Sequence, residues 1–424
     1  MKLLIYYTLW VFFRRDDLKF YFCSFYYEGT MNKGKFVYAQ IVEFLPQRVF
    51  DTIVLKYDGN RYVKHFTCWN QLLVMVFGQL TNRDSLRDLI VAIEAHNRKS
   101  YHLGFGKSVT RSNLSKANEN RDHRIFEEFA YYLIGVARQK LENNDFEIKG
   151  KVYAFDSTTV DLCLSVFWWA KFRKNKGGVK IHTLLDITTQ IPVFVHITTA
   201  SVNDVNAMDI IPYEAGAYYI FDRGYVDYTR LYKITKLESS FVIRARKNLK
   251  FEVKTNNPVD ETTGVITDQT GFLKGFYTSK DYPESLRRVA FYDKDKNTTL
   301  IFLTNNFELT AEQVAMLYKN RWQIELFFKW IKQHLKIKSF WGTSQNAVRI
   351  QIYSAIIAYC MVAIVGHDLQ IDRTTYEILQ ILGISLLDKT PVNELFTNID
   401  INDVKDLNDN KLIISLFKVE SGGL

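Results

Sequence analysis

Three carboxylates, Asp156, Asp222 and Glu325, are the residues of this chain whose types and positions could do chemistry together. Asp156 follows the apolar run 152–155 and Asp222 follows the apolar run 217–221, and each run predicts a buried strand. A side chain at the carboxyl end of a strand projects beyond the sheet, where ligands and metals commonly bind. Either aspartate alone would more often begin a turn, but two of them together with a helical glutamate indicate a shared site.

Carboxylates in such a group could hold two Mg²⁺ ions, for which Mn²⁺ can substitute, because hard cations prefer oxygen ligands. A pair of these ions activates a water or a 3′ hydroxyl on one side of a phosphodiester and stabilises the leaving oxygen on the other. His182 and His196 lie in alternating, strand-like segments and are expected to be packed or surface residues, not ligands. The three carboxylates therefore predict metal-dependent chemistry on a phosphodiester.

The predicted helix over 310–335 carries further polar residues on the face of Glu325. Thr310 and Gln313 form a capping-box pattern at its start. At about 100° per residue, Tyr318, Arg321 and Lys332 fall in one stripe with Glu325. A solvated face with an Arg321–Glu325 pair is the ordinary alternative. Because Glu325 is the single acid among many cations between 319 and 338, the stripe favours a metal-bound phosphate lying across the helix.

Two clusters of basic residues lie near the candidate carboxylates in the sequence. The first comprises Lys171, Arg173, Lys174, Lys176 and Lys180, and the second comprises Arg244, Arg246 and Lys247. Either could be solvated surface charge, but their position favours contact with the phosphates of double-stranded DNA. A mixture of cations and amides between Arg111 and Arg124 also predicts a helix that reads a DNA groove, with a solvated loop and helix as the alternative.

The segments that must position these residues predict an α/β protein. Helical periodicity dominates about 36–144, where Ser85 precedes a buried face at Leu86, Leu89, Ile90 and Ile93. Strand patterns follow at 152–155, 179–187, 191–199, 217–221 and 241–245, with a further hairpin at 289–293 and 298–303. The apolar run 350–365 is too short and too polar to span a bilayer and is expected to be a core helix.

The composition indicates a folded cytoplasmic protein. Of the 424 residues, 47% are hydrophobic and 24% are charged, which excludes a disordered chain. Four cysteines lie far apart without a C-x-x-C pair, which argues against a zinc ribbon or a disulfide framework. The net charge of +9 is a mild bias towards a polyanion such as nucleic acid. Residues 1–30 are aromatic-rich and lack clear periodicity, so Met1 and Met31 are equal candidates for the true start.

Several short motifs resemble one known family. Tyr318-x2-Arg321-x3-Glu325-x6-Lys332 resembles the Y-R-E-K signature of the IS-four family of bacterial insertion-sequence transposases. Asp156-Ser157-Thr158 and Asp222-Arg223-Gly224-Tyr225 resemble that family's two aspartate blocks, and the segment from Met31 through Gln71 resembles its N-terminal domain. The resemblance covers about 31–382 with the three catalytic blocks in family order, a far more specific conjunction than any block alone.

The resemblance implies an RNase H-like catalytic core, a mixed sheet flanked by helices, with a mostly β insertion. An α-helical DNA-binding domain would precede it. The expected boundaries are an atypical extension over 1–30, the helical domain over 31–146, the catalytic domain over 147–382 with its insertion at about 226–306, and a C-terminal tail over 383–424. Asp222 and Glu325 are about a hundred residues apart, which leaves room for the insertion.

The resemblance also implies roles for the site residues. Asp156, Asp222 and Glu325 would bind the metals, while Tyr318, Arg321 and Lys332 would hold DNA near the cut. The partners would be terminal inverted repeats and target DNA, bound by a homodimer that cuts and pastes through a hairpin at the transposon end. Family members hold a flipped base by aromatic stacking, in some relatives with a tryptophan of the insertion, but 225–320 contains no Trp. Phe251, Phe272, Phe276 or Tyr277 could take that role.

Two alternatives to an active transposase stay open. One is a metal-dependent nuclease of the same fold without strand transfer, which the sequence does not separate from a transposase. The other is a catalytically inactive DNA-binding remnant. The intact Asp156, Asp222 and Glu325 argue against the remnant, because a protein that only binds DNA has no need of three metal-holding carboxylates. The expected location is the bacterial cytoplasm, on the nucleoid, with no membrane partner.

Overall fold

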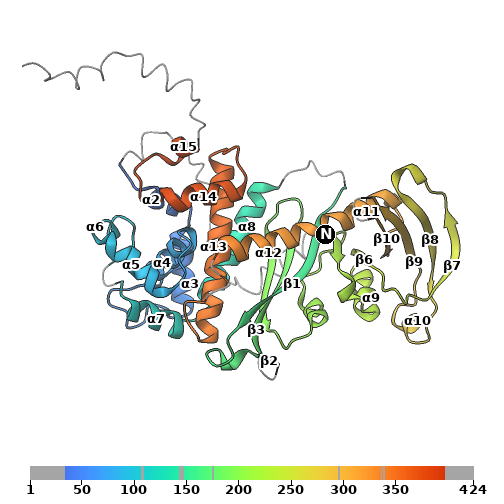
Figure 1. Ribbon diagram of the computed structural model, residues 1–424, viewed down its shortest axis with the longest axis horizontal. Helices are drawn as coiled ribbons and strands as arrows, with labels where there is room; N and C mark the ends of the chain where they lie inside the picture. Colours follow the sequence, from blue (N-terminus) through green and yellow to red (C-terminus); the bar gives the residue numbers. More distant parts are fainter. Residues whose placement is uncertain are drawn as a thin grey trace, which may run out of the picture.

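The computed structural model describes residues 34–396 apart from 107–108, 143–147, 174–175, 295–296, 336 and 338–339. The expected extension over 1–30 lies outside the described residues, as does the expected tail from 397 onwards. Within the described part, a group of helices lies beside one long, twisted sheet, and the two are joined by helices that cross between them (Figure 1).

The helical part forms from the first helices of the chain together with the last ones. Its helices are α2 (Val37–Val42), α3 (Gln47–Lys56), α4 (Cys68–Leu80), α5 (Leu86–Ala95), α6 (Asn97–Ser100), α7 (Arg111–Asn120) and α8 (Arg124–Leu141). Ser85 and Thr110 cap α5 and α7 by accepting backbone N–H groups, and Leu86, Leu89, Ile90 and Ile93 form the predicted buried face of α5.

The closing helices of the described chain are α13 (Gln345–Asp368), α14 (Thr375–Ser385) and α15 (Val392–Leu395). The backbone N–H of Val37 donates to the Asp388 carbonyl at 2.8 Å, so part of the segment expected as a tail packs on the first described helix. By length and composition α13 could cross a membrane, but 94% of its apolar window is buried inside the protein, as expected for a core helix.

The sheet has ten strands in the order β2-β3-β1-β5-β6-β10-β9-β8-β7, with β4 also paired to β3. The strands are β1 (Val152–Leu162), β2 (Lys171–Arg173), β3 (Lys176–Asp186), β4 (Pro192–Thr199), β5 (Tyr218–Phe221), β6 (Ser240–Arg244), β7 (Phe251–Asn257), β8 (Val265–Leu273), β9 (Leu286–Asp293) and β10 (Thr298–Thr304). β1, β5 and β6 are parallel, while β3 and β4 form the expected hairpin beside β1. This mixed sheet with flanking helices is the expected RNase H-like core.

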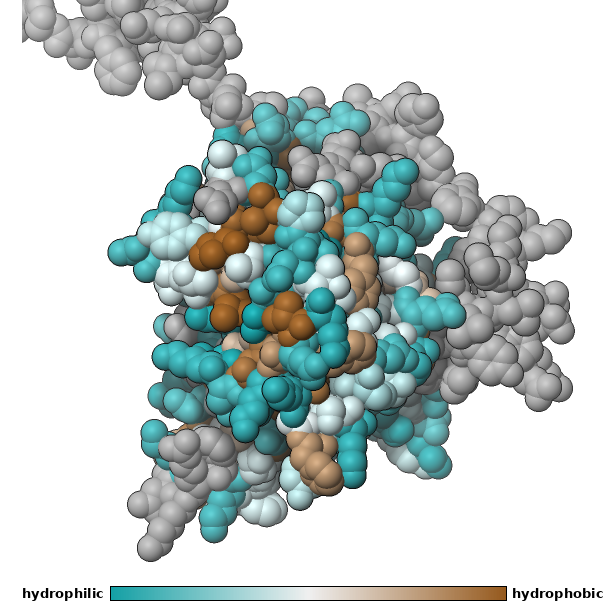
Figure 2. Space-filling model, turned by 90° about the vertical axis from the view of Figure 1, so that its right-hand side faces the viewer, coloured by the Kyte–Doolittle hydropathy of each residue, from teal (hydrophilic) through white to brown (hydrophobic). Residues whose placement is uncertain are grey.

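The antiparallel strands β7 to β10 extend the sheet beyond β6. β10 pairs with both β6 and β9, which places the expected β-rich insertion in the same sheet (Figure 1). α9 (Tyr228–Lys236) and β6 fall in the range predicted for the insertion but complete the parallel part of the core, and the first insertion strand begins at Phe251. Figure 2 views the molecule from this side and shows apolar side chains in small groups among polar ones.

The prediction that the first strand ends at Asp156 was wrong. β1 continues to Leu162, and its whole length after Val152 pairs with β3. The partner that does end there is β5, whose last paired residue, Phe221, lies opposite Phe155. Residues 157–162 alternate between exposed or half-buried and buried positions, a pattern that a long antiparallel hairpin sustains after the parallel neighbour has ended.

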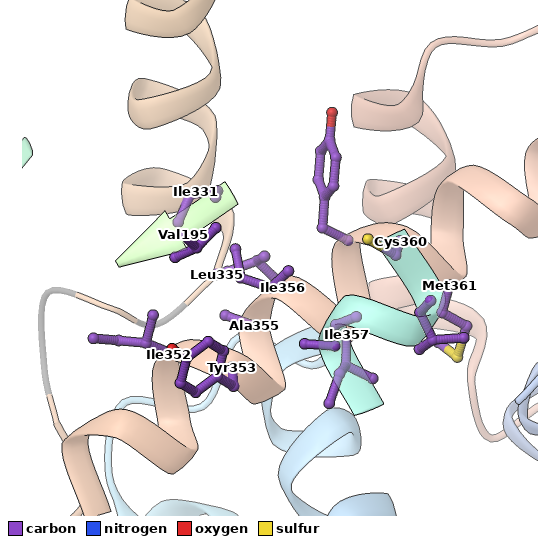
Figure 3. Packing of buried hydrophobic residues seen from close by; sticks show 14 of the residues in the cluster. Val195, Ile331, Leu335, Ile352, Tyr353, Ala355, Ile356, Ile357, Cys360 and Met361 are labelled. Atoms are coloured by element: carbon purple, nitrogen blue, oxygen red, sulfur yellow. The ribbon is translucent and has the colours of Figure 1, made fainter. Parts of the chain in front are cut away.

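The helix expected over 310–335 is divided at Arg321 into α11 (Ala311–Asn320) and α12 (Trp322–His334), and α11 has the predicted capping box. Arg321 keeps helical angles (φ −53°, ψ −29°), so the two parts follow one course in Figure 1. α12 packs on β1, and Figure 3 shows Ile331 of α12 and the following Leu335 beside Val195 of β4 and Ile356 of α13. This contact buries one face of α12 and leaves its polar face for the site.

Candidate active site

The two predicted aspartates lie at adjacent positions of the sheet. β1 and β5 are parallel, and their last pair joins Phe155 to Phe221. Asp156 and Asp222 come immediately after this pair, at the place where β5 ends and β1 continues with β3 as its remaining partner. The carboxyl end of a parallel strand pair is the usual location of ligand sites in such sheets.

Asp156 is held mainly through one of its two carboxylate oxygens. Its Oδ1 accepts the Ser157 backbone N–H at 2.8 Å and the Tyr225 hydroxyl at 3.4 Å, and its Oδ2 accepts from Arg321 Nη1 at 3.2 Å. Burial raises the pKa of Asp156 to about 6, and the negative charges of Asp222 and Glu325 add to the rise. The Ser157 N–H and Arg321 oppose it. Asp222 and Glu325 therefore lie close enough to Asp156 to act on it electrostatically.

Arg321 connects the first carboxylate to the third. Its guanidinium bonds Asp156 Oδ2 through Nη1 and Glu325 Oε1 through Nη2, while its side chain is only 15% exposed. Burial alone would lower the pKa of Arg321, but Glu325, Tyr318 and Asp156 outweigh it and raise the pKa. Arg321 is therefore a permanent cation between two of the predicted metal ligands.

Tyr318 and Lys332 extend the same helix face, as the sequence predicted. The Tyr318 hydroxyl donates to Asp222 Oδ1 at 3.3 Å, and its ring packs on Phe302 with centroids 4.6 Å apart. Burial raises the pKa of Tyr318 to about 12, so at neutral pH it is an uncharged hydrogen-bond donor. Lys332 donates from Nζ to the Thr159 carbonyl of β1 at 2.9 Å. The face with Tyr318, Arg321 and Glu325 thus lies against the end of the β1–β5 pair.

The donor atoms of Asp156, Asp222 and Glu325 suit a hard divalent cation, since all are carboxylate oxygens. Burial raises the pKa of Asp156, with smaller contributions from Asp222 and Glu325, and a bound cation would offset both effects by favouring the ionised carboxylate. Among the described residues no three carboxylate, imidazole or thiol side chains lie close enough to surround one ion, because Arg321 lies between Asp156 and Glu325. The three carboxylates are therefore suitable ligands for a divalent metal. Binding the metal would require Arg321 to break its ion pair with Asp156 or with Glu325.

The residues of the two basic clusters differ in their exposure and in their bonding partners. Lys171 and Lys176 are exposed on the β2–β3 hairpin, whereas Lys174 and the side chain of Arg173 lie outside the described part. Lys180 is 12% exposed and pairs with Asp204 at 3.1 Å. In the second cluster, Arg244 is half-buried near Tyr318, and its positive charge partly opposes the rise in the pKa of Tyr318 that burial causes. Lys247 is exposed. Arg246 donates to the Val226 carbonyl at 2.7 Å. Contact of these residues with DNA stays a prediction, and Lys180 and Arg246 have structural partners in this chain.

The two histidines are packed, as expected. His182 is fully buried, and burial lowers its pKa to about 4; its Nε2 lies 3.0 Å from Thr198 Oγ1. His196 stacks on Phe194, and burial lowers its pKa as well.

Sequence reasoning gave no role to three polar residues behind Asp156. Ser157 and Tyr225 belong to the two aspartate blocks, and Asp204 belongs to none of the motifs described above. The Ser157 hydroxyl donates to Asp204 Oδ1 at 2.6 Å. Asp204 begins a short 3₁₀ turn after β4, far from Ser157 in sequence, so no local periodicity could have connected the two.

An aspartate within β1, a second directly after β5 and a helical glutamate, together on an RNase H-like sheet, are typical of the class of metal-dependent phosphoryl-transfer enzymes that act on nucleic acid. The sequence model of the family described as the transposase DDE domain matches residues 147–361, and this chain belongs to that family. A second model, described only as a domain of unknown function, matches residues 33–106. The match spans all three candidate carboxylates, and enzymes of this family depend on a divalent metal.

Curated relatives carry the same description. A protein of Sinorhizobium fredii named as a transposase is 36% identical over 271 residues, which are 63% of this chain and 74% of the relative. A Geobacillus stearothermophilus protein named as the transposase of an insertion sequence element is 30% identical over 214 residues, covering 49% and 54% of the two chains. A similarly named Synechocystis protein is 27% identical over 293 residues, covering 67% and 80%.

Among solved structures, the piggyBac transposase in a synaptic complex with hairpin DNA aligns over 88% of this chain and 82% of its own. The sequence identity is 12% and the TM-score is 0.42, too low to support an argument, so the family assignment rests on the sequence matches.

Proposed function

We propose that this protein is the transposase of an insertion sequence, which cleaves DNA at the ends of its element and joins those ends to target DNA. The observation that carries the proposal is the position of Asp156 and Asp222 at the end of one parallel strand pair, with Glu325 connected to Asp156 through Arg321. Acidic side chains from distant parts of the chain are thereby brought to the end of the β1–β5 pair.

In this proposal Asp156, Asp222 and Glu325 hold two Mg²⁺ ions. When bound, such ions supply an activated water or 3′ hydroxyl and stabilise the leaving oxygen of the phosphodiester. The chain's own contribution is to position the phosphate. Tyr318 offers a neutral hydroxyl donor and Arg321 a planar guanidinium, both at the edge of the carboxylates and both able to bond non-bridging phosphate oxygens. Charge that develops on the phosphate is greatest in the transition state, where these donors matter most.

Lys332 holds the helix to the sheet in addition to carrying charge. Its bond to the Thr159 carbonyl ties α12 to the half of β1 that extends beyond Asp156. We therefore assign Lys332 a share in aligning Glu325 with Asp156, together with the electrostatic attraction of DNA.

The helical domain would bind the element's ends. A groove of about 700 Å³ runs between the loop 57–66 and α7. Its lining includes Arg61, Asn113, Lys116 and Asn120, a mixture of cations for phosphates and amides for base edges. Arg121 and Arg124, which the sequence placed in the same role, instead bond the Thr67 carbonyl and the Asp122 carboxylate respectively. The exposed Lys171 and Lys176 would contact DNA nearer the cut.

The remaining parts of the proposal concern assembly and base stacking. A homodimer would bring the two ends together, since one active site has to act on each end, and it would work in the bacterial cytoplasm, on the nucleoid. A flipped base at the cut could stack on the exposed rings of Phe276 or Tyr277, which contact each other, or on the partly exposed Phe272.

The decisive experiment is incubation of the purified protein with the DNA that flanks its own gene, in Mg²⁺. We expect nicked, hairpin and joined products, all lost in Asp156→Asn, Asp222→Asn and Glu325→Gln, because each change removes a metal ligand while keeping the side-chain shape. Asp161→Asn is the matched control, since Asp161 is exposed on the same strand as Asp156. Cleavage without any joined product would indicate the nuclease alternative, and end binding without cleavage would indicate an inactive remnant.

A further inference from the structure

Asp204 forms a bridge behind the first catalytic aspartate. It begins the 3₁₀ turn Asp204–Ile210, and its Oδ1 accepts the Ser157 hydroxyl at 2.6 Å. The same oxygen lies 3.1 Å from Lys180 Nζ and 3.9 Å from Nδ1 of the buried His182. Ser157 belongs to β1, and Lys180 and His182 belong to β3, so one carboxylate connects two neighbouring strands.

The register of the sheet explains why Asp204 reaches Ser157 and not Asp156. Ser157 is paired with His182 and Thr159 with Lys180, which places these side chains on one face of the sheet. The side chain of Asp156, the preceding residue, points to the opposite face, towards Arg321 of the helix. Asp204 therefore lies on the far side of β1 from the candidate metal ligands.

Ser157 transmits this contact to Asp156 through its own backbone. The Ser157 N–H donates to Asp156 Oδ1 at 2.8 Å, so the orientation of this peptide determines which carboxylate oxygen is held by the chain. The other oxygen, Oδ2, is left on the side of Arg321 and Glu325. A shift of Ser157 would thus turn the Asp156 carboxylate relative to the rest of the site.

β1 needs such support at this point because β5 ends opposite Phe155. From Asp156 onwards β1 has β3 as its neighbour on one edge, while the edge towards β5 has lost its ladder partner. Tyr225 approaches that edge with its hydroxyl 3.4 Å from Asp156 Oδ1, but a bond of this length constrains weakly. The short bond between Ser157 and Asp204 is the stronger constraint on the strand.

Lys180 makes the bridge rigid. It is 12% exposed, pairs with the Asp204 carboxylate and also donates to the Val202 carbonyl at 2.8 Å, so it holds both ends of the segment 202–204 against β3. A largely buried lysine with two partners is costly to leave unpaired. Lys180 therefore keeps Asp204 in place beneath Ser157.

We infer that Asp204 is a positioning residue for the catalytic centre, which acts through Ser157 to orient Asp156 for metal binding. This inference rests on the proposed function of Asp156 as a metal ligand. Groups that orient metal ligands in this way commonly change metal affinity by about 10-fold or more when they are removed.

The test is a double-mutant cycle on the full chain, read by calorimetric titration with Mn²⁺ alone and by the Mn²⁺ dependence of DNA cleavage. Asp204→Ala and Ser157→Ala should each weaken Mn²⁺ binding about 10-fold. The double variant should be no weaker than the more affected single variant, because both changes break one connection. In the single variants, saturating Mn²⁺ should restore most of the wild-type cleavage rate. The Mn²⁺ concentration that gives half of the maximal rate should stay above the wild-type value.

The matched control is Asp209→Ala, which removes an aspartate of the same 3₁₀ turn that pairs with Arg230 at 2.7 Å on the surface. It should leave the Mn²⁺ titration unchanged. Ser157→Thr, which keeps the hydroxyl, should restore most of the affinity that Ser157→Ala loses. If Asp204→Ala does not fold, Ser157→Ala carries the test, because it removes the same bond and leaves Asp204 paired with Lys180.

Two results would overturn the inference: unchanged Mn²⁺ binding in Asp204→Ala and Ser157→Ala, or losses that multiply in the double variant. Asp156→Asn separates this failure from that of the proposed function. If Asp156→Asn abolishes Mn²⁺ binding while Asp204→Ala leaves it intact, only the role of Asp204 is refuted. If Asp156→Asn itself binds Mn²⁺ and cleaves DNA normally, the proposed metal site is wrong and the inference falls with it.

Discussion

Asp156→Asn should stabilise the metal-free protein at neutral pH while abolishing its activity. In the folded chain burial raises the pKa of Asp156 from its ordinary value of 3.8 to about 6, helped by Asp222 and Glu325. The folded state therefore retains a proton on this carboxyl at pH values where the unfolded chain has already lost it. Ionising Asp156 at neutral pH costs stability, and asparagine, which resembles the protonated form, avoids that cost.

The sign and size follow from proton linkage. Below pH 3.8 the carboxyl is protonated in both states and contributes nothing. As the pH rises from 3.8 to about 6, the unfolded chain ionises first, so stability falls, and the loss is complete above about pH 6. At about 1.4 kcal/mol per pKa unit, this interval corresponds to at most about 3 kcal/mol. The opposing effect of Arg321 is already included, because it acts on the same pKa.

The assay is urea unfolding of the wild type and Asp156→Asn in EDTA at a series of pH values from 4 to 8. The free energy of unfolding of the variant should exceed that of the wild type by an amount that is near zero at pH 4 and grows towards about 3 kcal/mol at pH 8. Asp161→Asn, an exposed position on the same strand, should stay within about 0.5 kcal/mol of the wild type throughout. A variant that is less stable than the wild type at pH 8, or a difference independent of pH, would refute the reasoning.

Three other predictions concern separate parts of the chain. Lys332→Ala should lower the cleavage rate on pre-bound DNA at least tenfold, about 1.4 kcal/mol, while end binding in a gel-shift assay changes only a few-fold. The control Lys329→Ala, at an exposed position, should change neither the rate nor the binding by as much. Equal losses of rate and binding would make Lys332 a general phosphate contact. Arg287→Ala should lower the free energy of unfolding in urea by about 3–5 kcal/mol, because it leaves Asp268 buried without its bidentate partner. Apolar replacement of both residues should recover much of this loss. An unchanged midpoint of urea unfolding in Arg287→Ala would contradict the prediction. Among the described cysteines, Cys163 should be alkylated first by iodoacetamide, as followed by peptide mass spectrometry, since it is exposed and hydrogen bonds with Ser165 lower its pKa, while burial raises the pKa of Cys68 to about 11.

The sequence alone predicted the parts of this protein that depend on local pattern. Apolar runs predicted β5 and the β3–β4 hairpin, and the capping box at Thr310 marked where α11 begins. The period of the helix predicted that Tyr318, Arg321 and Glu325 share a face, and their bonds to Asp222 and Asp156 agree with that face. Such features are set by residues a few positions apart, which the sequence displays directly.

Tertiary structure decided what depends on pairing between distant segments. Asp156 lies within a long strand, and the site forms there because β5, not β1, comes to an end. Lys180 belongs to a basic run in the sequence, yet it pairs with Asp204 on a turn that no local pattern connects to it. The charge of a side chain does not specify its partner. The folding of the sheet does, because it brings together residues that lie far apart in the sequence.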